Sequence, residues 1–420
     1  MSLTTTPTPL RILISGAGIA GPCLAHWLAR TPISPPPKVT ILERAPTLRA
    51  TGQSIDIRGP AIGIVQKMGL QEGVRAKHTT EEGVRILGRS GAPVAEFGAG
   101  PKEGGGFTAE YEILRADLCG LVVESTKPFR NVEYRFGDYV TGLAQDAKEV
   151  NVTFNSGAQE TYDLVVGADG ASSKIRSLVL SGKDLENSYN FIGQYVAYFS
   201  IPSQKTDTRH WYWYNAPNGL ALMTRPHRNP DTIGVYMCIT TRAHGVRDAR
   251  VEKAMDAGPE GQKKVLHEVF KSVGWQAERI LEGLDICDDF YMSRCAQVKL
   301  PTWHAGRAVL LGDAAFATFG VGTSLAIHSA YTLASELAKI KSSDDIPRAL
   351  DDYEKAFREI YKKSEDLPLG YPQIAFPQTS LGLKLRDSLA WLVSKTKVYK
   401  LLPEDDGMGS EVAEYPWRNI

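Results

Sequence analysis

The alternation of apolar and polar residues in the first part of the chain predicts a strand, a helix and a second strand. An apolar run at 11–15 leads into a glycine-rich turn at 16–21, and apolar residues then recur at helical spacing over 22–30. A connector of three prolines, 35–37, precedes another apolar run at 39–43. This order of elements is typical of a parallel α/β sheet.

Further along, short strand patterns alternate with helical ones. Helices are predicted over 115–125 and within 251–282, and a strand at 308–311 precedes helices near 324–341 and 346–363. Period-two patterns predict strands at 84–97, 132–136, 139–146, 149–155, 159–167, 219–225 and 231–240. This order indicates a discontinuous first domain with a sheet domain inserted into it.

Aromatic residues crowd into 189–214, which favours an antiparallel sheet with one aromatic face. Because alternate residues of a strand face opposite ways, Trp211 and Trp213 share one side, and Tyr212 and Tyr214 share the other.

Composition narrows the classes of function. The 420 residues suit two domains, and the 43% hydrophobic and 23% charged content is that of a folded globular protein. Lys plus Arg and Asp plus Glu both number 48, so no net charge attracts nucleic acid. Five cysteines without a CxxC pair favour reduced thiols in the cytoplasm, with neither metal nor disulfides. No apolar window is long enough for a membrane span.

The stretch 380–402 carries leucines at helical spacing beside lysines and arginines. Two interpretations are open, a helix on a membrane surface and a C-terminal helix packed along the body. We prefer the packed helix because the chain has no basic excess.

The turn Gly16-Ala-Gly18-Ile-Ala-Gly21 predicts a dinucleotide site. Gly16 makes the tight turn, Gly18 lets backbone N–H groups approach a pyrophosphate, and Gly21 lets the helix pack closely on the sheet. Glu43 ends the next strand, where a carboxylate accepts hydrogen bonds from a ribose diol. The alternative is a purely structural turn.

Two later segments repeat the plan of a buried strand that ends in a glycine-containing turn before a helix. The first contains Asp169-Gly170, and the second runs from Gly312-Asp313 to Gly320-Val-Gly322-Thr323-Ser324. With these three fingerprints in order, the chain resembles the para-hydroxybenzoate hydroxylase family of single-component FAD monooxygenases. The resemblance covers residues 11 to about 335 and is greatest to the tetracycline-degrading and fungal natural-product branches.

The resemblance implies an α/β fold: a Rossmann-like FAD-binding domain, an inserted antiparallel-sheet substrate domain and C-terminal helices. We assign residues 1–80, 107–180 and 285–365 to the FAD-binding domain, 81–106 and 181–284 to the substrate-binding sheet domain, and 366–420 to a C-terminal helical segment.

The implied activity is a monooxygenation in which NADPH or NADH reduces FAD and one atom of O2 hydroxylates an aromatic or polyketide-like small molecule. Baeyer–Villiger insertion and epoxidation are alternatives, and a flavin-binding sensor without turnover is the alternative from another class. The choice of nicotinamide, the substrate and the oligomeric state stay open.

Cofactor-binding residues follow from the same resemblance. They are Gly16, Gly18, Gly21, Glu43, Arg44, Asp56, Arg115, Asp169, Gly312, Asp313, Gly320, Gly322 and Thr323. The glycines of the first turn and Glu43 would hold the pyrophosphate and the adenosine ribose, and Asp313 the ribityl chain. Arg115 is explained as well by a helix start, and Asp56 by a turn.

The chain departs from the family at 316–320. It has Phe316 and no proline before Gly320, where the family commonly has a proline-containing stretch. The N–H groups of the glycine loop before the next helix would stabilise a reduced, anionic flavin ring.

Substrate contacts are predicted for Trp211, Trp213, Met223, Arg225 and Phe319, with core packing as the alternative. No acid/base group stands out as catalytic. His210 and His227 border the aromatic sheet and are explained as well by surface or loop positions.

Overall fold

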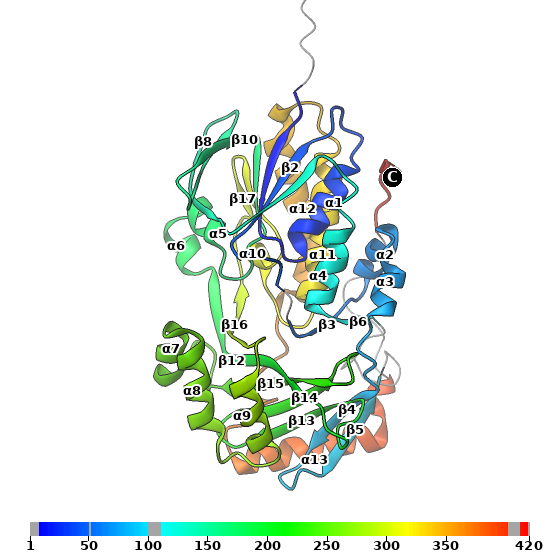
Figure 1. Ribbon diagram of the computed structural model, residues 1–420, viewed down its shortest axis with the longest axis vertical. Helices are drawn as coiled ribbons and strands as arrows, with labels where there is room; N and C mark the ends of the chain where they lie inside the picture. The colour runs from blue at the N-terminus through cyan, green and yellow to red at the C-terminus, as the bar shows by residue number, and fades with distance from the viewer. Residues whose placement is uncertain (1–7, 50–51, 100–110, 402–411, 419–420) are drawn as a thin grey trace, which may run out of the picture.

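The computed structural model describes residues 8–49, 52–99, 111–401 and 412–418, which build two bodies, each around its own sheet (Figure 1). The upper body in this view holds both ends of the described chain, and the lower body is inserted into it. The predicted fold class, α/β with an inserted sheet and C-terminal helices, is confirmed.

The six-stranded sheet of the first body has the order β17-β18-β11-β1-β2-β7. Its strands are β1 (Arg11–Ser15), β2 (Lys38–Glu43), β7 (Val132–Phe136), β11 (Leu164–Gly167), β17 (His304–Ala305) and β18 (Ala308–Leu310). All neighbours are parallel except β17 and β18. Both faces are covered, so its central strands are continuous apolar runs.

Helices cover one face of this sheet (Figure 1). They are α1 (Ala20–Ala29), α4 (Arg115–Glu124), α11 (Gly322–Leu337) and α12 (Ile346–Glu365). On the other side lie β8 (Val140–Gln145), β9 (Val150–Phe154) and β10 (Gln159–Tyr162), which form a three-stranded sheet, and the short helices α5 (Lys174–Val179) and α6 (Gly182–Glu186).

The strand predicted at 159–167 is two strands in different sheets. Residues of β10 pair with β9, and those of β11 pair with β1. Asp163 separates them because its backbone N–H and its carboxylate both bond to Arg11, which turns the chain from one sheet to the other.

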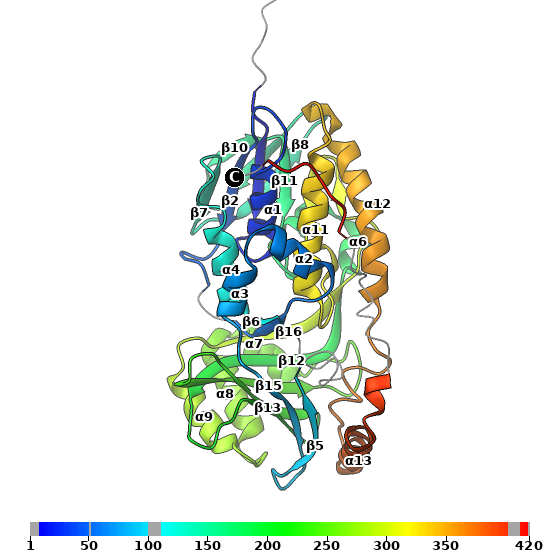
Figure 2. The same ribbon diagram turned by 90° about the vertical axis from the view of Figure 1, so that its right-hand side faces the viewer.

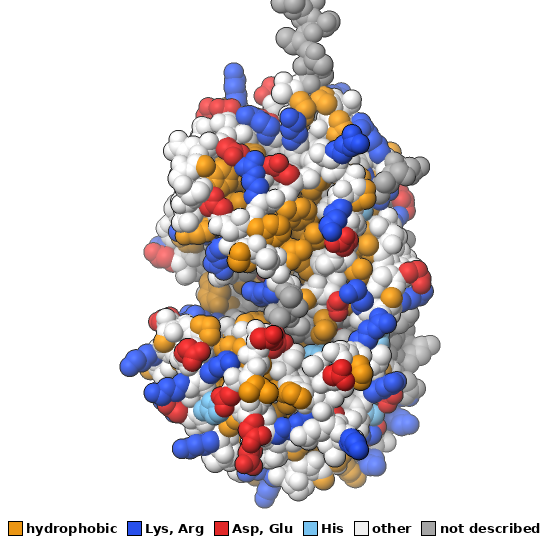
Figure 3. All heavy atoms as spheres, viewed as in Figure 1, with side chains coloured by type: hydrophobic (Ala, Val, Ile, Leu, Met, Phe, Trp, Pro, Cys, Tyr) orange, Lys and Arg blue, Asp and Glu red, His pale blue; other side chains and the backbone are white. Residues whose placement is uncertain are grey.

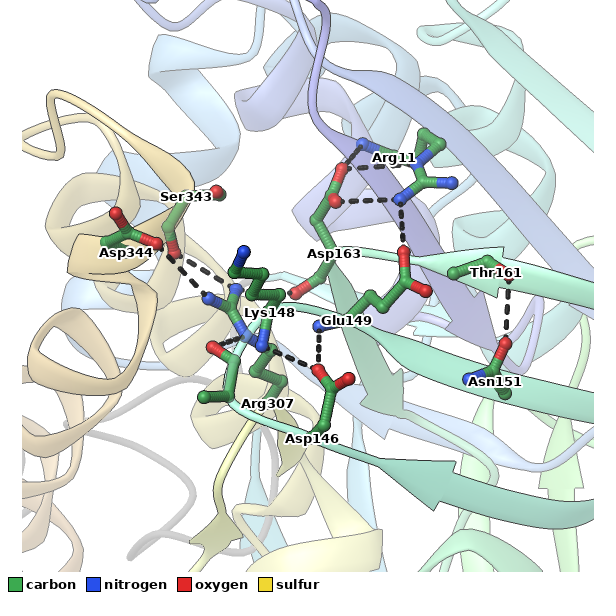
Figure 4. A network of polar contacts seen from close by, with 11 residues as sticks. Arg11, Asp146, Lys148, Glu149, Asn151, Thr161, Asp163, Arg307, Ser343 and Asp344 are labelled. Atoms are coloured by element: carbon green, nitrogen blue, oxygen red, sulfur yellow. Dashed lines mark hydrogen bonds and ion pairs between the residues drawn. The ribbon is translucent and has the colours of Figure 1, made fainter.

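A buried arginine joins the six-stranded and three-stranded sheets (Figure 4). Arg307 donates from Nε to Ala147 O (2.9 Å) and from Nη1 to Asp163 O (3.2 Å) and Ser343 O (3.0 Å). Arg11 bonds to Asp163 Oδ1 at 2.9 Å and reaches Glu149 at 3.5 Å. These contacts connect three loops at the edge of the first body, including the short 3-10 turn Ser343–Asp345.

The second body contains a seven-stranded sheet of order β16-β12-β15-β14-β13-β4-β5. Its strands are β4 (Gly83–Leu87), β5 (Pro93–Gly98), β12 (Tyr189–Pro202), β13 (His210–Ala216), β14 (Leu220–Pro226), β15 (Thr232–Thr240) and β16 (Tyr291–Val298). It is antiparallel apart from the parallel pair β13 and β4. The predicted segment 285–365 of the FAD-binding domain includes β16, which the structure pairs with β12 of this second sheet.

Helices lie on both sides of this sheet, as Figure 2 shows. One side packs against α7 (Ala249–Asp256), α8 (Gly258–Phe270) and α9 (Ala277–Ile286). On the other side, α13 (Ser380–Thr396) contacts β5 and β13. Helix α13 therefore packs along the body through Leu383, while Leu381, Leu385 and Leu389 stay exposed.

Between the two bodies run β3 (Ser54–Asp56) and β6 (Glu112–Leu114), which form an antiparallel pair. Helices α2 (Pro60–Lys67) and α3 (Gln71–Ala76) follow β3 in the chain. The four-residue helix α10 (Asp313–Phe316) and a 3-10 turn at Val398–Leu401 complete the elements of the described chain. A search of the described helices found none with the length and apolarity that a bilayer crossing needs.

Candidate active site

A cavity of about 970 Å³ is lined by residues of both bodies. The surface is notched where the bodies meet, and apolar side chains gather near the centre of the face shown in Figure 3. Among the described residues, the sequence-predicted cofactor and substrate residues all line this cavity except Gly21 and Gly312. The structure thus brings together residues that lie up to about three hundred positions apart.

The first glycine turn has the shape that a phosphate-binding turn needs. Gly16 has φ +118°, and a Cβ there would lie 2.3 Å from Ala168 O, whereas a Cβ on Gly21 would lie 2.1 Å from Gly16 O. Nothing lies within 4 Å of a Cβ placed on Gly18, which faces open space. Helix α1 begins at Ala20 without a side-chain cap, so its first N–H groups are available to an anion.

Glu43 is held at the end of β2 by two backbone groups. Ala17 N donates to Oε2 at 3.0 Å and Ala45 N donates to Oε1 at 2.9 Å. The carboxylate therefore lies directly beside the glycine turn and lines the cavity. A carboxylate accepts several hydrogen bonds, so these two leave capacity for a ribose hydroxyl.

Asp169 also lines the cavity, but its carboxylate is engaged by the start of α5. Ser173 Oγ donates to Oδ1 at 2.5 Å, and the backbone N–H groups of Lys174 and Ile175 donate to Oδ2. Ser173 in turn accepts from Arg176 N and so caps the start of α5. A contact of Asp169 with the cofactor stays a prediction.

Asp313 is the opposite case. It begins α10 and has no hydrogen-bond partner among the described residues, although it lies at the cavity. Burial raises the pKa of Asp313, and the charge of Arg115 opposes that rise. A Cβ on Gly322 would lie 3.2 Å from Asp313 Oδ1, so the glycine loop passes close to this carboxylate. An unpartnered acceptor in this place fits the hydroxyl groups of a ribityl chain.

The structure places Arg115 and Asp56 at the cavity, where a contact of either with the cofactor stays a prediction. Arg115 begins α4 and also lines the cavity. Asp56 ends β3, pairs through Oδ2 with Arg58 at 2.7 Å, and keeps Oδ1 buried without a partner in the described structure. The unsatisfied oxygen at the cavity is a place for a donor from a ligand.

The altered segment 316–320 divides between core and cavity. Phe316 is buried, with its ring 4.8 Å from that of Trp303 and 5.2 Å from that of Phe357. Phe319 lines the cavity and packs 4.4 Å from Tyr371. Helix α11 then begins at Gly322 without a side-chain cap, so unpaired N–H groups stand at the cavity.

The sheet of the second body contributes an aromatic wall. Trp211 and Trp213 stack with their rings 5.4 Å apart and 8° from parallel, and Trp213 lies 5.4 Å from Phe376. Both tryptophans and Met223 line the cavity. Tyr214, on the opposite face of β13, stacks on Trp275, so the predicted division of this strand into two faces is confirmed.

Arg225 lies under this wall in a buried ion cluster. Its Nε donates to Glu81 Oε2 (2.9 Å), and Nη2 donates to Glu81 Oε1 (3.1 Å) and Glu112 Oε2 (2.8 Å). Sequence reasoning found Arg225 and missed both glutamates. No local pattern marks them, because each lies more than a hundred residues from Arg225 along the chain.

Two histidines that border the sheet lie outside the cavity lining. His210 is 3.5 Å from Glu96, and His227 Nδ1 is 3.1 Å from Thr232 Oγ1. The described residues contain no cluster of His, Cys, Asp and Glu suited to a metal ion.

The chain is similar in sequence to known flavin-dependent proteins. A family model described as FAD binding domain matches residues 10–367. The chain is 34% identical to the flavin-dependent monooxygenase eupH of Phoma sp., over 97% of this chain and 98% of that one. It is also 34% identical to monooxygenase CTB7 of Cercospora beticola, over 93% and 94%.

Solved structures show the same fold. Tetracycline destructase Tet(51) superposes with a TM-score of 0.73 at 25% identity, over 97% of this chain and 100% of that one. Klebsiella pneumoniae HpxO, solved with FAD and uric acid, has a TM-score of 0.70 at 18% identity, over 95% and 97%.

Proposed function

The chain belongs to the FAD-binding domain family and is a flavin-dependent monooxygenase, and from that premise we propose that it uses NADPH or NADH and O2 to hydroxylate an aromatic or polyketide-like small molecule. One observation carries the proposal. A single cavity joins the glycine turn and Asp313 of the first body to the stacked tryptophans of the second. Cofactor and substrate therefore share one space.

FAD, when bound, supplies the redox chemistry, in which two electrons from the nicotinamide let one oxygen atom enter the substrate and the other leave as water. In our proposal the start of α1 holds the pyrophosphate, Glu43 the adenosine ribose and Asp313 the ribityl hydroxyls. The N–H groups before α11 stabilise negative charge on the ring. The same space is lined by further predicted cofactor residues, namely Arg44, Asp56, Arg115, Asp169 and Thr323.

The aromatic wall serves the substrate in this proposal. Trp211, Trp213 and Met223 form a flat apolar surface that excludes water and orients a planar ring. Phe319 and Tyr371 close the side next to the glycine loop. The proposal agrees with the names of the fungal relatives, which are flavin-dependent or FAD-dependent monooxygenases.

The test is turnover with a balance of products. The isolated protein with noncovalent FAD should oxidise NADPH or NADH faster when a suitable phenol or ketone is present, and the product made under ¹⁸O2 should carry one labelled oxygen atom. A label without ring hydroxylation, in an ester or an epoxide, would replace hydroxylation by one of those reactions. Flavin binding without substrate-dependent turnover across a broad panel would indicate a sensor.

The cofactor assignment has its own test. Asp313→Ala should raise the Kd for FAD about ten- to a hundredfold, because a hydrogen bond to a charged acceptor contributes about 1.5–3 kcal/mol. The matched control is Asp231→Ala, which alters an exposed aspartate away from the cavity. Equal FAD affinity in the two variants, measured by flavin fluorescence on titration of the apoprotein, would contradict the role of Asp313.

A further inference from the structure

We propose that Glu81 and Glu112 make this cavity selective for uncharged substrates that carry a hydrogen-bond acceptor, such as aryl ketones, over carboxylates of the same shape. The inference rests on the proposed function in one respect, that the substrate lies against the aromatic wall. It concerns residues that hold Arg225 rather than residues that react, so Glu81 and Glu112 are positioning residues for a substrate contact.

The hydrogen bonds of Arg225 already occupy most of its guanidinium. A free arginine binds a carboxylate through two parallel N–H donors. Here Glu81 takes such a bidentate pair through Nε and Nη2, and Glu112 takes a second bond from Nη2. Among the described residues Nη1 has no hydrogen-bond partner. Arg225 can therefore offer a ligand one nitrogen and not a fork.

The charges point the same way. Two carboxylates face one guanidinium, so the cluster is neutral with one proton on it and carries a negative charge without that proton. The side chains of Glu81 and Glu112 are 1% exposed and that of Arg225 is 9% exposed, so water screens these charges weakly. A carboxylate ligand would be the third anion around one cation, whereas a ketone oxygen adds no charge.

The other cations of the described cavity lining lie outside this sheet. Arg225 is the one charged side chain that the seven-stranded sheet contributes to the described lining. The remaining cationic residues of the lining belong to segments of the first body or of the connection between the bodies, namely Arg44, Arg49, Arg58, Arg115 and Lys174. Of these, Arg58 is paired with Asp56.

Aromatic rings fix the position of the guanidinium. Its Cζ lies 4.5 Å from the ring centre of Trp211 and 6.0 Å from that of Tyr236. Trp211 stacks on Trp213, so the donor nitrogen and the aromatic wall are parts of one surface. A flat aromatic ketone can cover the wall while its oxygen reaches the arginine.

The protonation of Glu81 should tune this selectivity. Burial raises the pKa of Glu81, Arg225 opposes the rise, and the nearby carboxylates Glu112 and Asp56 add to it. Besides these groups, Arg58 faces the same region through Asp56. As the pH increases and Glu81 loses its proton, the cluster becomes negative and rejects a carboxylate more strongly.

The experiment compares two probes of one shape, 2-acetylnaphthalene and 2-naphthoate, by calorimetric titration of the oxidised FAD-loaded protein. At pH 8 the wild type should bind the ketone at least about tenfold more tightly. Glu112→Gln and Glu81→Gln should each raise the naphthoate affinity by about tenfold and change the ketone affinity by less than about threefold. Glu96→Gln, an exposed glutamate outside the lining, is the matched control.

The pH dependence of naphthoate binding is a second test of the proposal. The Kd of the wild type for naphthoate should increase from pH 6 to pH 8.5, since the probe is ionised throughout and only the protein changes charge, and Glu81→Gln should abolish the increase. Equal or tighter naphthoate binding by the wild type at pH 8, unchanged selectivity in folded variants, or failure of both probes to bind would overturn the proposal. Selective binding without oxygenation of any compound in a panel of phenols and ketones would instead contradict the proposed function.

Discussion

Two buried arginines, one at the edge of the first body and one at the cavity, show how the same residue type does different work. Arg307 has a 1% exposed side chain and bonds to the backbone oxygens of Ala147, Asp163 and Ser343, with its nearest carboxylate, Asp344, 4.0 Å away and exposed. Arg225 is nearly as buried, but its partners are two buried carboxylates.

The acceptors explain the difference. Backbone carbonyls are fixed parts of three loops, so Arg307 holds these loops together. Arg307 is not among the residues that line the cavity. Carboxylates can gain or lose a proton, so the partners of Arg225 set the charge of a surface that a ligand meets. Burial of a charge alone therefore does not identify a functional site. The identity of its partners and the space beside it do.

The largest expected effect is a loss of folding stability when Arg307, at the edge of the first body, is replaced. Arg307→Met should lower the free energy of unfolding by about 3–5 kcal/mol, because three backbone carbonyl groups lose at once the charged, buried donor that joins them. Urea unfolding followed by circular dichroism measures this loss, and FAD affinity should stay within about threefold of the wild type. The unfolding free energy of Arg307→Lys, which keeps the charge but loses the planar guanidinium, should lie between those of the wild type and Arg307→Met. A loss of stability below about 1 kcal/mol would contradict the role of Arg307 in holding the three loops together.

The second prediction concerns how Arg225→Met responds to pH. Removing the guanidinium takes away the charge that lowers the pKa of Glu81, so that pKa rises further above its unfolded value. A carboxyl group of this kind stabilises the fold below its unfolded pKa, and that contribution is lost as the pH rises through the folded pKa. The variant should thus be destabilised by on the order of 2 kcal/mol more at pH 8.5 than at pH 6.0.

Urea midpoints of wild type and variant at the two pH values measure this difference. Arg228→Met alters an exposed arginine just after β14 and is the matched control. It should change stability by the same small amount at both pH values. The Arg307→Met variant should also lose stability equally at both pH values, because its partners do not titrate. If Arg225→Met lost the same stability at both pH values, the carboxylates around Arg225 would act like the non-titrating carbonyl groups around Arg307.

The smallest loss of stability is expected at Arg11, the exposed arginine of the network that also contains Arg307 (Figure 4). Arg11 contacts Asp163 and Glu149, but 41% of its side chain is exposed. Arg11→Gln should lower the free energy of unfolding by about 1 kcal/mol or less, and added salt should reduce the difference, since solvent screens such pairs. A loss as large as that of Arg307→Met would mean that the whole network of Figure 4 acts as one unit.

Local patterns were sufficient to determine much of the first body. The strand at 11–15, the glycine turn and Glu43 at the end of the second strand occupy the positions that the sequence predicts. Turns and helix starts depend on residues close together in the chain, so their signals survive in the sequence alone. The same holds for the two faces of β13, since strand geometry sets which side chains alternate.

Long-range pairing could not be predicted in this way. The parallel contact of β4 with β13, the place of β16 in the second sheet and the division of 159–167 between two sheets all depend on partners distant in the chain. A period-two pattern marks a strand without naming its neighbour.

Local sequence patterns are enough to specify an α/β protein with a glycine-rich turn after its first strand and a carboxylate at the end of its second. The surroundings of Arg225 depend instead on the tertiary fold, because Glu81 and Glu112 reach it from 144 and 113 positions away. The free energy of a buried charge depends on every charge and dipole within a few ångströms, whatever their separation along the chain. A glutamate before a strand has no local mark that it will share an arginine with another glutamate.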